Sequence, residues 1–212
     1  MITDEEIKKI FEWADEFEII GKSVNSHLKW GIDVKDNEKI RRGIPRDKEL
    51  LLKLTHLNLT GYGATKRFEI RYIPSELCKL TNLKWIDLSY NFISYLPINF
   101  SNLINLEFLN ISLNALENLN NIENHKLKHL IIDDISISKD FVTKCPKIEL
   151  IEILNSKTRK DNIKRMSFYY LGYNKDIGIL VRTPNIEKPT KPTPPKPNHK
   201  KPFKNFLYKG DK

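Results

Sequence analysis

Long hydrophobic runs are missing from this chain of 212 residues. None of its apolar stretches approaches the about 18 consecutive residues that mark a membrane-spanning helix. Residues 1–6 include three acidic side chains and lack the basic and then apolar layout of a secretory signal peptide. We therefore expect a cytoplasmic protein without a membrane span.

Cysteine is scarce as well, since Cys78 and Cys145 are the only two in the sequence. Thiols stay reduced in the cytoplasm, so we do not expect a disulfide between them. A free cysteine in a protein core behaves as a small apolar residue. Cys145 stands three residues before Ile148, where corresponding positions of the chain hold leucine, and we expect it to be buried.

Common catalytic motifs are also absent, among them Gly-x-Ser-x-Gly, His-Glu-x-x-His and Cys-x-x-Cys. The segment Gly61-x-Gly63-x-x-Lys66 has neither the spacing of a phosphate-binding loop nor a helix after it. The sequence therefore predicts no enzyme activity, no catalytic residue, no cofactor and no nucleotide site.

One group of residues has the composition of a metal site, namely His125, His129, Asp133 and Asp134. A His-x3-His pair turns both imidazoles to one side only on a helix. His129 falls in a predicted strand, so the two rings should diverge. We expect no metal to bind there.

Positive charge is concentrated near the C-terminus. The chain has a net charge of +9, and residues 183–212 contribute +6 of it, from eight lysines against two acidic residues. Seven of the 11 prolines lie in the same segment. Residues 185–202 cannot form a core and should be extended, partly as polyproline II. We therefore expect residues 183–212 to form a disordered basic Pro/Lys-rich tail.

What the chain does contain is one short aliphatic pattern, repeated five times. The first residues of the five copies lie 29, 23, 21 and 21 positions apart, a period typical of a solenoid. The copies are Leu54-x-x-Leu57-x-Leu59, Leu83-x-x-Ile86-x-Leu88, Leu106-x-x-Leu109-x-Ile111, Leu127-x-x-Leu130-x-Ile132 and Ile148-x-x-Ile151-x-Ile153. A single copy cannot bury its own apolar edge, so neighbouring copies must stack.

The central copy, residues 83–106, reads LKWIDLSYNFISYLPINFSNLINL. This pattern resembles the leucine-rich repeat family in its small bacterial, Ras-group-like form, whose template ends in LPxxLxxLxxL. The resemblance implies an α/β solenoid: a right-handed leucine-rich repeat arc with a parallel β-sheet on its concave face. It also implies protein binding, without naming a partner.

We divide the chain into four parts. Residues 1–43 should form an N-terminal helical cap, because Thr3-x-x-Glu6 is a capping box and Ile7, Ile10, Phe11, Ala14 and Phe17 then recur at helical spacing. A partner-binding helix is the alternative, and residues 28–32 could add a strand. Residues 44–156 should hold about five repeats.

Residues 157–182 should form a C-terminal cap. Residues 166–173 and 177–181 have the composition of two strands around a turn, which favours a hairpin. A helix over residues 161–171 is the alternative. Residues 183–212 are the tail described above.

Alternation along each strand turns every second side chain outward. Because the strands should be parallel and in register, equivalent outward positions form columns on the concave face. We predict that these columns bind the partner, through His56, Asn58, Trp85, Asp87, Ser89, Phe108, Asn110, Ser112, His129, Ile131, Asp133, Leu150 and Glu152. The alternative for Trp85 and Phe108 is that they stack only to stabilise neighbouring strands.

Two asparagines, Asn91 and Asn114, follow the second and third strands at the same distance. We expect this asparagine ladder to bond backbone groups that would otherwise be buried without partners. The corresponding positions of the other copies hold Tyr62, Ile135 and Ser156, and Ile135 indicates that the fourth turn is built differently.

Together these patterns indicate a non-catalytic protein-protein interaction module, monomeric and cytoplasmic, that binds an unidentified protein or peptide on its concave face. In a second hypothesis the tail binds nucleic acid or an acidic membrane surface, and the repeats act as a folded anchor. A third is a secreted bacterial effector, since similar repeats occur in such proteins.

Overall fold

The computed structural model describes residues 2–19, 28–35, 38–61, 68–133, 135, 137, 138, 140–154, 169–174 and 179–184, the last two ranges as backbone strands. Its elements follow in chain order: α1 (Asp4–Glu16), α2 (Lys48–Leu52), β1 (His56–Asn58), the 3₁₀ helix η1 (Ser75–Lys79), β2 (Trp85–Asp87), the 3₁₀ helix η2 (Phe100–Asn102), β3 (Phe108–Asn110), β4 (His129–Asp133), α3 (Phe141–Lys144), β5 (Leu150–Leu154), β6 (Tyr169–Asn174) and β7 (Ile179–Pro184).

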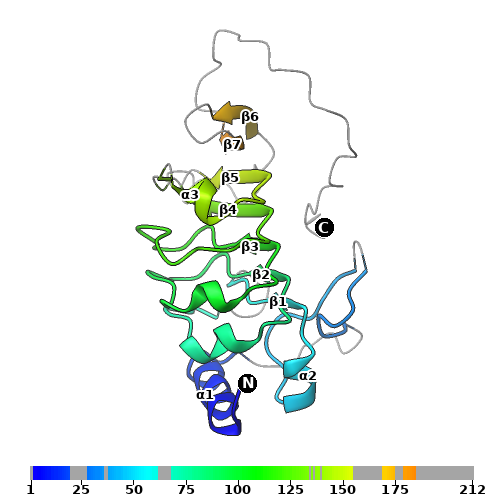
Figure 1. Cartoon of the computed structure of the whole chain (residues 1–212). Helices are drawn as coiled ribbons and strands as arrows, with labels where there is room; N and C mark the ends of the chain where they lie inside the picture. Colours follow the sequence, from blue (N-terminus) through cyan, green and yellow to red (C-terminus); the bar gives the residue numbers. More distant parts are fainter. Residues whose placement is uncertain are drawn as a thin grey trace.

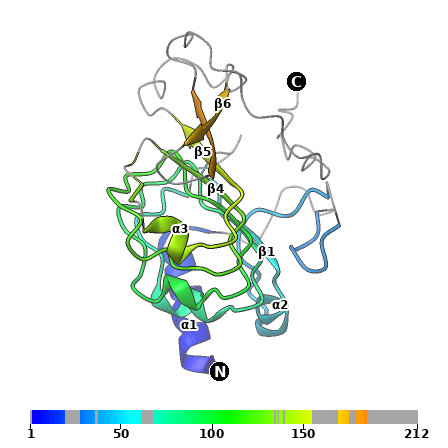
Figure 2. The same ribbon diagram turned by 45° about the horizontal axis from the view of Figure 1, so that its top comes forward.

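One sheet organises the molecule, with the strand order β1-β2-β3-β4-β5-β7-β6. Strands β1 to β5 are parallel and follow one another in sequence order, which confirms the predicted stack of five strands (Figure 1). Figure 2 shows the chain winding in successive turns behind these strands. The structure is therefore an open α/β solenoid.

The repeated aliphatic residues form its core. The second residue of each strand from β1 to β5 is fully buried or nearly so, namely Leu57, Ile86, Leu109, Leu130 and Ile151. Ile44-Pro45, Ile73-Pro74 and Leu96-Pro97 each lead into the short helices α2, η1 and η2, which return the chain to the next strand. Cys78, in η1, and Cys145, which follows α3, are buried free thiols.

Helix α1 lies at the β1 end of the stack (Figure 1). Thr3 and Glu6 form the expected reciprocal capping box. The helix buries Ile7, Ile10, Trp13 and Ala14, and Glu6 binds Lys79 of η1. Trp13 was not part of the predicted apolar stripe, yet it is only 3% exposed.

Segment 28–32 differs from the predicted strand. Instead of a regular strand, the described residues around it form isolated bridges. These join Lys29 to Ile40, Gly31 to His56 and Arg42 to Asn58. Gly31 approaches β1 closely, because a Cβ atom on it would lie only 2.1 Å from the carbonyl oxygen of His56, so this position requires a glycine.

Beyond β5 the sheet continues with β7, which runs parallel to β5, and with β6, which runs antiparallel to β7. The two predicted strands are thus present, shifted along the chain by two or three residues, and β7 includes Thr183 and Pro184, which we assigned to the tail. Residues 62–67, residues 155–168 and the tail beyond residue 184 lie outside the described residues.

The asparagine ladder consists of two side chains whose partners occupy equivalent positions in successive repeats. Asn91 accepts a hydrogen bond from the Ile70 N–H (3.1 Å), and Asn114 accepts one from the Ile93 N–H (3.0 Å). Each amide nitrogen also donates to three backbone carbonyls: those of Leu59, Leu88 and Ser89 for Asn91, and those of Leu88, Ile111 and Ser112 for Asn114.

In the fourth repeat Asp133 also binds backbone groups of the preceding turn. Its two carboxylate oxygens accept hydrogen bonds from the backbone N–H groups of Leu113 (2.9 Å) and Asn114 (3.0 Å). Ile135 stands where the ladder would continue, so the fourth turn is indeed built differently. The sequence pattern located this change but not the residue that compensates for it.

Candidate binding surface on the sheet

The outward face of the sheet carries a column of rings across four strands. Strand pairing places His56 beside Trp85, Trp85 beside Phe108 and Phe108 beside His129, with Leu150 next in line. All five side chains are half-buried. We call His56, Trp85, Phe108 and His129 the ring column.

The rings of this column are in direct contact. Trp85 and Phe108 are stacked, with ring centroids 5.2 Å apart and an interplanar angle of 9°. His56 stacks on the other side of Trp85 at 6.1 Å, and His129 meets Phe108 edge to face at 5.0 Å. Such pairs contribute about 0.5–1.5 kcal/mol each beyond burial. The column is therefore held in one conformation before any partner arrives.

The two imidazoles at its ends have different surroundings. Thr55 Oγ1 donates to the Gly31 carbonyl and lies 2.9 Å from His56 Nδ1, so Nδ1 carries the hydrogen and Nε2 is left as an acceptor. Burial, together with the charge of Lys84, lowers the pKa of His56. His129 Nε2 lies 3.0 Å from Glu152 Oε1. One end thus presents a neutral acceptor, and the other an imidazole beside a carboxylate.

The indole N–H of Trp85 has no hydrogen-bond partner among the described residues, although this atom is buried. A buried donor without a partner costs about 1–3 kcal/mol, and most such groups in proteins are satisfied. Because this atom is closed off from solvent, it does not offer a donor at the surface of the ring column.

The second outward column is partly buried: Asn58 and Asp87 are buried, and Asn110, Ile131 and Glu152 are half-buried. Asn58, Asp87 and Asn110 each accept a hydrogen bond from the backbone N–H two residues further on, so their side chains turn back onto the strand ends. Asn58 and Asp87 are only 5% and 3% exposed. Burial raises the pKa of Asp87, opposed by hydrogen bonds from Ser89 and Asn110.

In the third outward column, Ser89, Ser112 and Asp133 are buried because they also form hydrogen bonds within the protein. Ser89 and Ser112 donate their hydroxyls to Asp87 and Asn110 of the second column, and Asp133 caps the turn of the preceding repeat. These side chains support the sheet instead of facing solvent. Of the predicted contact residues, those with half-buried side chains are His56, Trp85, Phe108, Asn110, His129, Ile131, Leu150 and Glu152.

Other asparagines that sequence analysis missed also bind backbone groups of neighbouring repeats. Asn82 donates to the Leu52 carbonyl and Asn105 to the Thr81 carbonyl. The buried Asn124 donates to the Leu103 carbonyl. Asn82 and Asn105 both directly precede the first leucine of a repeat, and that shared position was the signal available in the sequence.

The described members of the histidine and aspartate group of the sequence analysis lie in different surroundings, and Asp134 is outside the described residues. His125 is exposed, and the imidazole of His129 faces Glu152. Within the part of the chain that the structure describes, no three His, Cys, Asp or Glu side chains are arranged to hold a metal ion. No helix among those residues is long and apolar enough to cross a membrane.

Comparison with known proteins shows a likeness to solved structures. No protein-family model matches the chain, and no curated protein does. Among solved structures, the chain is similar to a leucine-rich repeat protein of Leptospira interrogans, with 29% sequence identity and a TM-score of 0.41. The match covers 52% of this chain and 28% of the Leptospira chain, so it spans less than a third of that protein.

Proposed function

We propose that this chain is a non-catalytic interaction module that binds a protein or peptide on the outward face of its sheet, which the sequence resemblance predicts to be concave. The observation that carries the proposal is the ring column, whose four rings stay half-buried while Asn58, Asp87, Ser89 and Ser112 beside it are buried. A few residues, often aromatic, supply most of the binding energy at protein interfaces.

The chemistry of the column defines the partner. It offers the apolar ring edges of Trp85 and Phe108, whose faces are covered by neighbouring rings, and an acceptor at His56 Nε2. A partner with an apolar side chain flanked by a backbone or side-chain donor matches this order. The ring column crosses three gaps between strands, about 14 Å at roughly 4.8 Å per gap. This length suits a short peptide or one protruding loop.

The small size of the column limits the affinity. A standard protein interface buries about 800 Å² on each partner, more than four rings can offer. We therefore expect weak binding, unless neighbouring segments such as residues 62–67 also contribute.

The test is partner capture with the full chain and with the double variant Trp85→Ala/Phe108→Ala. We expect the double variant to lose capture while its circular dichroism spectrum stays close to that of the wild type. Phe92→Ala is the matched control, because Phe92 is also a partly exposed aromatic residue (47%) but lies outside the column.

Capture that survives in the double variant at wild-type level would refute the proposal. Capture that weakens steeply between low and physiological salt would point to phosphate binding by lysines instead. If the double variant unfolds, Trp85→Phe should still keep the stack and can be compared by titration with the purified partner.

A further inference from the structure

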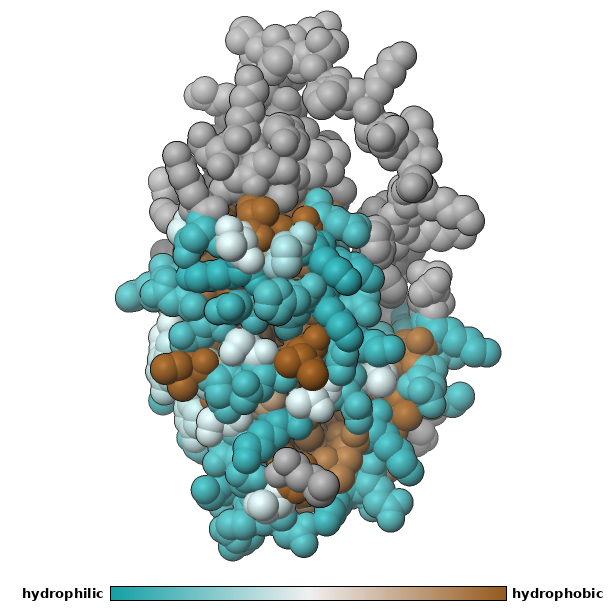
Figure 3. All heavy atoms as spheres, viewed as in Figure 1, coloured by the Kyte–Doolittle hydropathy of each residue, from teal (hydrophilic) through white to brown (hydrophobic). Residues whose placement is uncertain are grey.

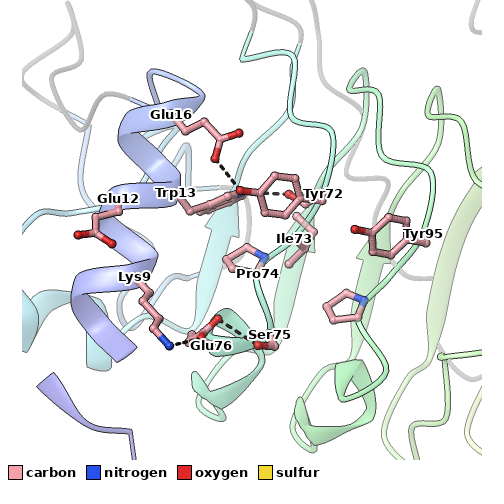
Figure 4. A pocket seen from close by; sticks show the side chains of 11 residues that line it. Lys9, Glu12, Trp13, Glu16, Tyr72, Ile73, Pro74, Ser75, Glu76 and Tyr95 are labelled. Atoms are coloured by element: carbon pink, nitrogen blue, oxygen red, sulfur yellow. Dashed lines mark hydrogen bonds and ion pairs between the residues drawn. The ribbon is translucent and has the colours of Figure 1, made fainter. Parts of the chain in front are cut away.

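A second surface lies away from the sheet, between α1 and the turns of the first two repeats. It is a groove of about 560 Å³. Figure 4 shows Trp13, Tyr72 and Tyr95 following one another from α1 across the first repeat to the second, with Pro74 between the walls. In the space-filling view of Figure 3, hydrophobic surface occurs in separate small patches among hydrophilic residues.

The walls of the groove are held by hydrogen bonds. The Trp13 indole N–H donates to the Tyr72 carbonyl (3.0 Å), and the Tyr72 hydroxyl donates to Glu16 Oε2 (2.5 Å). The bond to Glu16 raises the pKa of Tyr72 to about 12. Tyr95 has 60% of its surface exposed and is free to contact a ligand. The groove therefore has a fixed base and one open aromatic side.

The groove is acidic. Glu12, Glu16 and Glu76 line it together with a single lysine, Lys9, which lies 3.4 Å from Glu76. Its lining residues thus carry a net charge of −2 (1 − 3), and α1 as a whole carries six acidic residues against two lysines. A ligand with positive charge is favoured at this surface.

An aromatic groove with acidic borders matches a proline-rich and lysine-rich segment, because polyproline II segments dock in aromatic-lined grooves. This chain has such a segment: Pro189, Pro192 and Pro195 recur every third residue, as do Lys188 and Lys191. Polyproline II has three residues per turn. In that conformation the three prolines would lie on one edge and the two lysines on another.

We propose that the chain's own segment 188–197 docks in the groove between α1 and the first two repeats, with its prolines against Tyr72 and Tyr95 and its lysines toward the glutamates. The surface is separate from the ring column, so this docking does not depend on the proposed function. It would make the groove an internal recognition site.

The length of the tail permits this contact within one molecule. Strand β7 runs parallel to β5, so Pro184 ends at the same edge of the sheet from which the turns after β1 and β2 depart. Five gaps separate β7 from β1, about 24 Å at ~4.8 Å per gap. A polyproline II segment advances about 3.1 Å per residue, so Pro192 and Pro195, which follow Pro184 by eight and 11 residues, can lie about 25 and about 34 Å from it and are the prolines that reach the groove. Tethering gives an effective concentration in the millimolar range, so weak affinity is sufficient.

The test uses the full chain with a benzophenone amino acid in place of Thr193, which lies between Pro192 and Pro194. After irradiation, mass spectrometry should find cross-links to the peptides that contain Tyr72 and Tyr95. Tyr95→Ala should reduce their yield about fivefold or more, as expected for loss of an aromatic anchor. Ile104→Ala is the matched control, because Ile104 is also 60% exposed and does not line the groove.

Two further experiments distinguish the possible occupants of the groove. An equal mixture of isotopically light and heavy chains should give cross-links within one isotope form, and mixed pairs would show that a second copy supplies the tail and would overturn the proposal. A benzophenone in place of Phe206 should not label the groove, and preferential labelling from that position would assign it to the apolar end of the chain. Cross-links scattered over the surface, or a yield unchanged by Tyr95→Ala, would also overturn the proposal.

Discussion

Substitution of Asn91 by alanine tests the asparagine ladder most directly. Asn91 is completely buried, and its side chain accepts one hydrogen bond and donates to three carbonyls. Two of those carbonyls keep another partner in the variant, since Gly61 N–H also donates to Ser89 and Asn114 also donates to Leu88. The Ile70 N–H and the Leu59 carbonyl lose the hydrogen bond that the structure shows for each.

The magnitude follows from those two groups. Leaving a buried backbone donor or acceptor without a partner costs about 1–3 kcal/mol each, so Asn91→Ala should lower the free energy of unfolding by about 2–6 kcal/mol. This is a large fraction of the total stability of an ordinary domain, about 5–15 kcal/mol. The variant should therefore unfold at a clearly lower urea concentration, with the slope of the transition unchanged.

Urea unfolding followed by circular dichroism measures this change. Asn105→Ala is the matched control, because Asn105 also bridges two repeats, through the Thr81 carbonyl, but lies at the surface. It should cost no more than about 1 kcal/mol. If Asn91→Ala stayed within about 0.5 kcal/mol of the wild type, as neutral surface substitutions do, the reasoning about the ladder would be wrong.

Two other predictions concern ionisable groups. Because burial raises the folded-state pKa of Asp87, its contribution to stability is fully present below the unfolded pKa and is lost as the pH rises through the folded pKa. The stability of Asp87→Asn relative to the wild type should therefore increase from acidic to neutral pH in urea titrations, and a flat difference would contradict this. Burial also raises the pKa of Cys78 to about 12 and that of Cys145 to about 11, so neither thiol should react with Ellman's reagent until the protein unfolds. Rapid reaction under native conditions would contradict the buried positions, with the urea-unfolded chain as the control for full reactivity.

Sequence reasoning worked best where a period was present. The spacing of the aliphatic residues predicted five parallel strands, and the pairing of His56 with Trp85 and of Trp85 with Phe108 follows directly from the equal spacing within each copy. Copies with the same internal spacing can stack in only one register without exposing their apolar residues. For that reason the ring column could be predicted before its geometry was known.

Sequence reasoning failed where the outward direction of a side chain did not decide whether its polar atoms reach solvent. Asp87 and Ser89 point outward, as predicted, yet they are buried because they turn back to bind the backbone and each other. An outward position in the alternating pattern shows on which side of the sheet a residue lies. Whether its polar atoms remain available depends on the hydrogen bonds of the strand end.

What the sequence determined by itself was the periodic part of this protein: the number of stacked strands, their register, the buried aliphatic positions and the capped start of α1. These features depend on the spacing of residues within short segments, and that spacing can be read directly from the sequence. Only the tertiary structure decided which polar side chains remain on the surface and where α1 packs. The groove between Trp13 and Tyr72 joins residues 59 positions apart, and no periodicity relates them, so their contact arises only when the folded chain brings the helix against the first repeat.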